Sequence, residues 1–168
     1  MKSGNSASTE ELQKAIASIT EQRCWGVVAG SGTGSIFTLY LGGKIPRESP
    51  LSNQHLSNDV RSFDAEFMLM VWSSWLLDRS NKEICSSESD NSNFGIMVEG
   101  LKRLCGRKIL DVEYIQAQGM YLCFEDDYYL SIFFDALEIY GSDGENFTIF
   151  TPDEIVSVNS QLEIVSGD

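Results

Sequence analysis

Histidine occurs once in this chain of 168 residues, at position 55. A hydrolase with a serine or cysteine nucleophile activated by histidine would therefore have to use His55. The residues around His55 are irregular and contain no nucleophile-elbow sequence. The pattern indicates a Ser/His/Asp or Cys/His catalytic system only weakly.

Besides His55, the residues whose types could support catalysis are three consecutive acidic residues, Glu125, Asp126 and Asp127. A buried carboxyl with a raised pKa can act as the general acid of a two-carboxylate hydrolase. These three lie between two apolar runs, which predicts a hairpin tip where carboxyls are solvated and ionised. We therefore interpret the chain as a binding protein rather than an enzyme, and we expect no cofactor.

The cysteines, Cys24, Cys85, Cys105 and Cys123, are widely spread and include no Cys-x-x-Cys pair. With one histidine in the chain, this spacing argues against a zinc site, and we expect no metal. A disulfide framework would be unusual at this length. We expect reduced thiols and a cytoplasmic protein.

Charge is the strongest compositional feature, because 25 acidic residues outnumber 12 basic ones and give a net charge of −13. The excess lies in residues 108–168, where Lys108 is the one basic residue. Nucleic-acid binding needs several Lys or Arg contacts to phosphates, so we exclude nucleic acid as a partner. An acidic surface attracts basic proteins instead. The predicted contact set is Glu125, Asp126, Asp127, Asp135, Glu138, Asp143 and Glu145; the alternative is an acidic face that serves solubility.

A second candidate site lies in the irregular stretch Gly43–Ala65, which contains Pro46 and Pro50. Long structureless connections are uncommon in compact domains and are often functional. We therefore consider a pocket under residues 44–64 that would bind an anionic ligand, in a binding or enzymatic domain. Its ligand-binding residues would be Lys44, Arg47, His55 and Arg61. The alternative for this stretch is a surface crossover between sheets.

These groups must be positioned by a core built on Glu66–Asp78. From Phe67 to Trp72 every residue is apolar, which predicts a strand covered on both faces. Ser73 and Ser74 interrupt the run and predict a bulge or bend that redirects the chain from Trp75.

Two amphipathic segments and several short strands surround this stretch. The N-terminal helix is expected to begin at a capping box, Ser8 to Glu11, after a loose tail over residues 1–7. A short amphipathic helix is expected at residues 97–105. Short β segments follow at 109–115, 121–124, 128–134, 147–150, 155–158 and 162–165. We predict one α+β domain over residues 1–168, a mainly antiparallel sheet or roll, with no segment long and apolar enough to enter a membrane.

The order of these motifs also resembles a known group of sequences. The runs Gly43–Arg47 and Pro50–Asn53, then Glu66–Trp75, Leu101–Ile109 and the acidic hairpin are similar to a family of uncharacterised small bacterial proteins. They resemble, more loosely, the immunity proteins of polymorphic toxin systems. The resemblance covers most of the chain from about Gly34 onward. It implies a compact domain that neutralises a basic toxin, without implying a catalytic residue.

Overall fold

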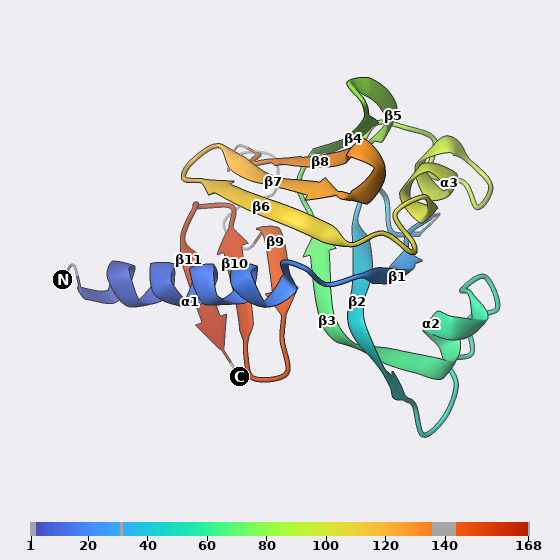
Figure 1. The fold of residues 1–168 in the computed structure, drawn as a ribbon, viewed down its shortest axis with the longest axis horizontal. Helices are drawn as coiled ribbons and strands as arrows, with labels where there is room; N and C mark the ends of the chain where they lie inside the picture. The colour runs from blue at the N-terminus through green and yellow to red at the C-terminus, as the bar shows by residue number, and fades with distance from the viewer. Residues whose placement is uncertain (1–2, 31, 136–143, 168) are drawn as a thin grey trace.

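The structure is a computed structural model that describes residues 3–30, 32–135 and 144–167; residues 3–7 are described by their backbone alone. These residues form two antiparallel sheets and three α-helices, which confirms the predicted α+β fold (Figure 1). The first sheet has the order β1 (Cys24–Val28), β2 (Phe37–Pro46), β3 (Phe63–Val71), β9 (Glu145–Phe150), β10 (Ile155–Asn159) and β11 (Ile164–Gly167). The second has the order β5 (Lys82–Ser86), β4 (Trp75–Arg79), β8 (Tyr128–Phe133), β7 (Gly119–Phe124) and β6 (Ile109–Ile115). The helices are α1 (Ser3–Ile19), α2 (Asn58–Ser62) and α3 (Ile96–Lys102).

The predicted break at Ser73 and Ser74 is the point where the chain leaves one sheet and enters the other. The strand β3 ends at Val71 in the six-stranded sheet, and β4 begins at Trp75 in the five-stranded sheet. The N–H groups of Trp72 and Ser73 both donate to the Asn146 carbonyl, at 2.9 and 3.1 Å. The crossover is therefore tied to the start of β9 by backbone hydrogen bonds.

The two sheets also meet along the segment that precedes β1. The N–H of Ile109 donates to the Gln22 carbonyl at 2.9 Å, and the N–H of Cys24 donates to the Arg107 carbonyl at 2.9 Å. An isolated antiparallel bridge joins Arg23 to Lys108. The sheets are thus joined at this corner as well as at the crossover.

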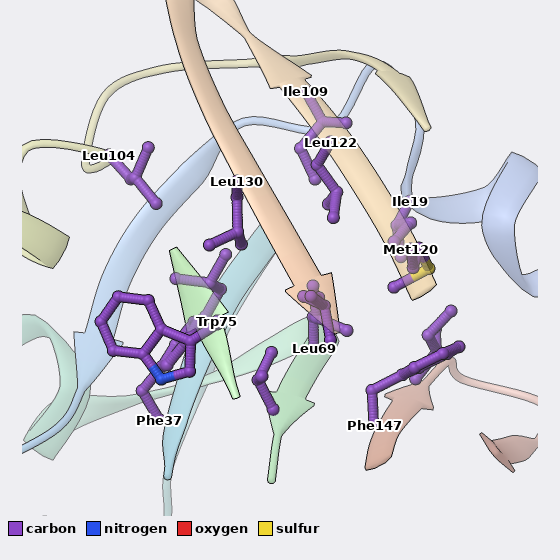
Figure 2. Packing of buried hydrophobic residues seen from close by; sticks show 14 of the residues in the cluster. Ile19, Phe37, Leu69, Trp75, Leu104, Ile109, Met120, Leu122, Leu130 and Phe147 are labelled. Carbon is purple, nitrogen blue, oxygen red and sulfur yellow. The ribbon is translucent and has the colours of Figure 1, made fainter. Parts of the chain in front are cut away.

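A single main core fills the space between the sheets (Figure 2). Trp75 is 1% exposed, and its ring meets that of Phe37 edge-on with centroids 4.8 Å apart. The predicted apolar stripe of α1 is buried against this core at Leu12, Ala15, Ile16 and Ile19. The opposite face of β3 is covered by a second, smaller cluster of Tyr40, Val60 and Ala65, with Met68 packed against it. Both faces of β3 are therefore covered, as its apolar run predicts.

Two of the predicted boundaries are wrong. The helix α1 begins at Ser3 and not at Ser8, so residues 3–7 extend the helix and are not a loose tail. A helix nucleated by a packed apolar stripe adds further turns at little cost, so an internal Ser8 does not end it. The helix α3 ends at Lys102, earlier than the predicted Cys105.

The stretch Gly43–Ala65 is also more regular than predicted. The strand β2 continues to Pro46 and pairs with β3, whose first residues are Phe63 and Asp64. A bulge between Leu41 and Lys44 allows this extension, and Gly42 within it has φ +76°, where a Cβ would lie 2.8 Å from the Glu66 carboxylate. What remains between the strands is a loop and the single-turn helix α2.

Candidate functional site

The predicted acidic tip between β7 and β8 is paired with basic residues of the same chain. Glu125 Oε1 accepts from Arg23 Nη1 at 2.8 Å and from the backbone N–H of Lys108 at 2.7 Å. The Lys108 N–H, followed by the Arg23 guanidinium, lowers the pKa of Glu125. Glu125 therefore joins the tip to the start of β6 and is not a free charge.

Asp126 is similarly occupied. Its Oδ2 lies 3.2 Å from Arg107 Nε, and its carbonyl accepts from Arg79 Nε at 3.1 Å. The guanidinium carbons of Arg79 and Arg107 lie 4.8 and 4.6 Å from the centroid of the Tyr128 ring. The tip thus contains two guanidinium–tyrosine contacts beside a carboxylate. Asp127, in contrast, is exposed; its carbonyl accepts from the Ser80 N–H at 3.1 Å and its carboxylate accepts from Ser80 Oγ at 3.4 Å, but it makes no ion pair with a described residue.

The other predicted contact residues do not join the tip. The carboxylate of Asp135 bonds to Ser74 in the crossover between β3 and β4. Glu145 begins β9, and burial raises the pKa of its carboxyl, whose Oε2 has no hydrogen-bond partner among the described residues. Glu138 and Asp143 lie outside the described residues. The structure therefore brings together Glu125, Asp126 and Asp127 and separates them from Asp135 and Glu145.

The basic residues of the second candidate site hold their own loop. Lys44 Nζ lies 3.1 Å from Asp59 Oδ2 and 5.2 Å from the centroid of the Trp25 ring. Arg47 Nε donates to the Val60 carbonyl at 3.2 Å. Arg61 Nε donates to the Leu51 carbonyl at 2.9 Å. The three cations therefore stabilise the conformation of residues 44–64, and they do not converge on a shared site.

His55 lies apart from those three cations, beside a cleft of 280 Å³. The cleft is bounded by Val27 and Val28 of β1 and by Val98 and Lys102 of α3. Lys44, Arg47 and Arg61 do not line it. His55 Nδ1 is 3.5 Å from Asn93 Nδ2. The cleft thus offers one imidazole and one ammonium to a ligand, instead of the four-cation site that we expected.

A more coherent surface is the side of the five-stranded sheet that faces away from the core. Strand pairing sets Asp78, Tyr129, Cys123 and Asp111 side by side across β4, β8, β7 and β6. The adjacent row that points the same way is Leu76, Ser131, Tyr121 and Glu113. We call this surface the outer face; it consists of Leu76, Asp78, Asp111, Glu113, Tyr121, Cys123, Tyr129, Ser131 and Phe133.

Three aromatic rings lie in the middle of the outer face, and Tyr121 of β7 with its diagonal neighbour Tyr129 of β8 forms what we call the tyrosine diagonal. The rings of Tyr121 and Tyr129 are stacked with centroids 6.3 Å apart, and Phe133 meets Tyr121 edge-on at 6.4 Å. Diagonal neighbours on one side of a sheet are within reach of aromatic side chains, which explains the contacts. Phe133 is 40% exposed. The rings therefore remain available to a partner.

Acidic side chains border this diagonal without basic partners. Asp111 and Glu113 lie on β6 at one side, and Asp78 with Glu83 opposite it lie at the other. None of the four makes an ion pair with a described residue. Burial, and then the charges of Asp111 and Glu113, raise the pKa of the Cys123 thiol. The outer face is thus a field of uncompensated negative charge.

One end of the outer face is hollowed. A depression of 710 Å³ lies between the β4–β5 turn and the β7–β8 tip. Asp78 and Asp127 contribute carboxylates to it, and Tyr129 and Leu110 contribute ring and aliphatic surface. Leu110 is 47% exposed because a bulge between Ile109 and Asp111 displaces it from the core. This hollow connects the predicted tip residue Asp127 to the outer face.

Comparisons with family models, curated proteins and solved structures found no match. The resemblance to immunity proteins therefore stays a prediction, and the function must be inferred from the residues themselves.

Local sequence patterns account for part of the outer face and leave out the rest. The alternation in β6 places Asp111 and Glu113 on the solvent side, and both are exposed. Tyr121 and Tyr129 also alternate with buried residues in their strands. The missing information was the strand order, because it is the adjacency of β4, β8, β7 and β6 that brings Asp78 to the same surface.

Proposed function

We propose that this chain is a non-enzymatic acidic protein that binds a basic protein partner and neutralises it by covering its surface, in the manner of an immunity protein. The observation that carries the proposal is a set of carboxylates that lack basic partners among the described residues: Asp78, Asp111 and Glu113 on the outer face, and Glu83 opposite Asp78. Charges left uncompensated in the free protein are available to pair with a partner's cations. The net charge of −13 likewise favours attraction of a positively charged partner.

The physical advantage of such a surface is rapid capture. Complementary fields raise association rates by roughly 10–10³-fold at low salt. A toxin must be intercepted before it acts, so a basic toxin such as a nuclease is the class of partner that this chemistry would serve. We expect the encounter to take place in the cytoplasm.

Binding of an anionic small molecule under residues 44–64 is less well supported. It requires Lys44, Arg47 and Arg61 to converge on a pocket, whereas each contacts a neighbouring residue of its own loop. The nearby cleft contains His55 and Lys102 instead. A thermal-shift screen of anionic metabolites tests this alternative. A rise in the melting temperature of the wild type that is lost in the His55→Ala variant would favour it.

The proposed function is tested by co-purifying the full chain with the product of the neighbouring gene at about 20 mM salt, where electrostatic attraction is least screened. We expect a stable complex and inhibition of whatever toxic activity that product has. A variant with Asp127→Lys should bind more weakly, because Asp127 is exposed and makes no ion pair with a described residue. Absence of association at low salt would contradict the proposal.

A further inference from the structure

We infer that the outer face of the five-stranded sheet is the docking surface for a protein segment that presents arginine side chains, which lie on the tyrosine diagonal and pair with the bordering carboxylates. This inference rests on the proposed function and specifies where and how the basic partner binds. It moves the contact region from the predicted acidic set to the outer face, with Asp127 at its end.

The first reason is that the described helices leave this face open. The main contacts of α1 are with β9, β10 and β11, those of α2 with β1 and β3, and those of α3 with β5 and β1. The sandwich interior takes up the other side of the sheet, where Leu122 and Leu130 are buried (Figure 2). In Figure 1, β6 and β7 lie above α1 and above β9–β11. A sheet with one packed and one open face is a typical antiparallel arrangement, and no described helix covers the open face.

The second reason is the arrangement of charge. Asp111 and Glu113 on β6 and Asp78 on β4 flank the rings from both sides. Arg79, which follows Asp78 in the chain, and Arg107 lie over the Tyr128 ring at the tip, and neither makes an ion pair with the carboxylates of the outer face. A segment carrying two or more cations would complement this pattern, whereas an acidic segment or a second copy of this chain would be repelled.

The third reason is the presence of tyrosine between the carboxylates. Arginine stacks its planar guanidinium on aromatic rings and pairs with carboxylates through several N–H donors, so it fits a surface with both groups better than lysine does. The chain already uses this combination, since Arg79 and Arg107 lie over Tyr128 beside Asp126. Tyr129, Asp78 and Asp127 around the hollow repeat these groups without a cation among the residues that line it.

The hollow also matches the shape of the expected side chain. Leu110 supplies an exposed aliphatic wall. The three methylene groups of arginine bury readily along apolar surface while the charged head reaches polar groups. An arginine entering here would contact Leu110 with its stem and Asp78 or Asp127 with its guanidinium.

The inference is tested with two synthetic probes, nona-arginine and nona-lysine, titrated into the ¹⁵N-labelled full chain. We expect amide shifts to concentrate at Asp111, Glu113, Tyr121 and Tyr129, with nona-arginine binding more tightly. At about 0.3 M salt, Tyr121→Thr should weaken nona-arginine binding about two- to fivefold, because stacking is less screened than charge pairing. Tyr121→Phe keeps the ring and should retain the affinity, which separates loss of stacking from loss of folding.

The charged border is tested at about 20 mM salt with a matched pair of double variants. Asp111→Asn with Glu113→Gln should weaken binding about tenfold, since both lost charges are on the docking surface. Glu10→Gln with Glu163→Gln removes the same charge from exposed positions elsewhere and should change affinity less than twofold.

Three outcomes would overturn the inference: equal losses in the two double variants, amide shifts centred on α1 or the His55 cleft, or a wild-type dimer that uses the outer face. If these occur while the wild type still binds the neighbouring gene product, the proposed function stands and only the docking surface fails. If the wild type binds neither probe nor that product at low salt, the proposed function fails as well.

Discussion

The carboxylate of Asp135 accepts two hydrogen bonds from Ser74, one from the backbone N–H and one from the hydroxyl, each 2.8 Å long. This pair fixes the crossover at which the chain passes from one sheet to the other. The N–H of Asp135 in turn donates to the Asn146 side chain at 3.1 Å. A residue of the predicted contact set therefore holds together the crossover between the two sheets.

Replacing Asp135 with alanine should lower the free energy of unfolding by about 2–4 kcal/mol, because two hydrogen bonds to a charged acceptor are lost. Asp135→Asn keeps one acceptor oxygen and should cost less. Urea unfolding measures both values. The folded fraction of either variant should bind the partner with wild-type affinity, and an affinity loss without a stability loss would show that Asp135 contacts the partner after all.

The central tryptophan provides a second test. Trp75 Nε1 donates to the Ser35 carbonyl at 2.8 Å inside the core. Trp75→Ala should cost about 3–5 kcal/mol of unfolding free energy through loss of buried area and the resulting cavity. Trp75→Phe should cost less but still leave the Ser35 carbonyl without its donor.

The matched control is Trp72→Phe, because Trp72 Nε1 has no hydrogen-bond partner among the described residues. Both changes remove an indole N–H, but only the change at Trp75 breaks a described hydrogen bond. Thermal or urea unfolding should therefore rank Trp75→Phe as the more destabilising. The reverse ranking would contradict the packing described here.

Asp78 should make the free energy of unfolding fall as pH rises. A salt-bridged acid, whose pKa is lowered, would do the opposite. Burial raises the pKa of its carboxyl, against a hydrogen bond from the Asn81 backbone. The folded state therefore holds this proton more tightly than the unfolded state, so stability is lost as pH rises through the raised value. Asp78→Asn should raise the urea midpoint at pH 7, and the gain should vanish below about pH 4.

Asp111→Asn is the control for this prediction, because Asp111 is exposed and should change stability by less than about 0.5 kcal/mol. Both variants should weaken binding of the basic partner. A carboxylate that costs stability and supports binding is the pattern expected of a functional residue. If Asp78→Asn lowers stability at pH 7, the interpretation of Asp78 as a destabilising acid that faces the partner is wrong.

Thiol reactivity should separate the four free cysteines. A hydrogen bond with Cys24 lowers the pKa of Cys105, which is partly exposed. Burial raises the pKa of Cys85 to about 12. Because the thiolate is the reactive form, iodoacetamide at pH 7.5 should label Cys105 first and Cys85 last, as peptide mass spectrometry would show. Faster labelling of Cys123 than of Cys105 would contradict this order, since burial and nearby carboxylates raise the pKa of Cys123.

Local sequence patterns predicted the strands well and the helix ends poorly. The apolar run in Phe67–Trp72 and the Ser73–Ser74 break are short-range features, and they correspond to β3 and to the change of sheet. The start of α1 was missed because the Ser8 capping pattern is favourable but not sufficient to begin a helix where the preceding residues can also be helical. The extension of β2 to Pro46 was missed because Pro46 was interpreted as part of an irregular stretch, although proline is tolerated at the end of a strand.

The candidate site depended on long-range information that the sequence does not contain. The run of acidic residues placed Glu125 and Asp126 at a solvated hairpin tip and in the predicted contact set; Arg23 and Arg107, distant in sequence, pair with them. Conversely, the exposed acids of the outer face come from separate strands and become neighbours only through pairing. Net charge therefore predicts a cationic partner, and strand order determines the surface at which we propose that it binds.

The central claim is that negative charge on this protein captures a cationic protein. The most direct measurement is the association rate constant with the neighbouring gene product, determined by stopped-flow fluorescence at about 20 and 200 mM salt. We predict that the rate constant falls at least about tenfold over this range and that Asp111→Asn with Glu113→Gln reduces both the rate constant and its dependence on salt. An association rate that does not change with salt in the wild type would contradict the account.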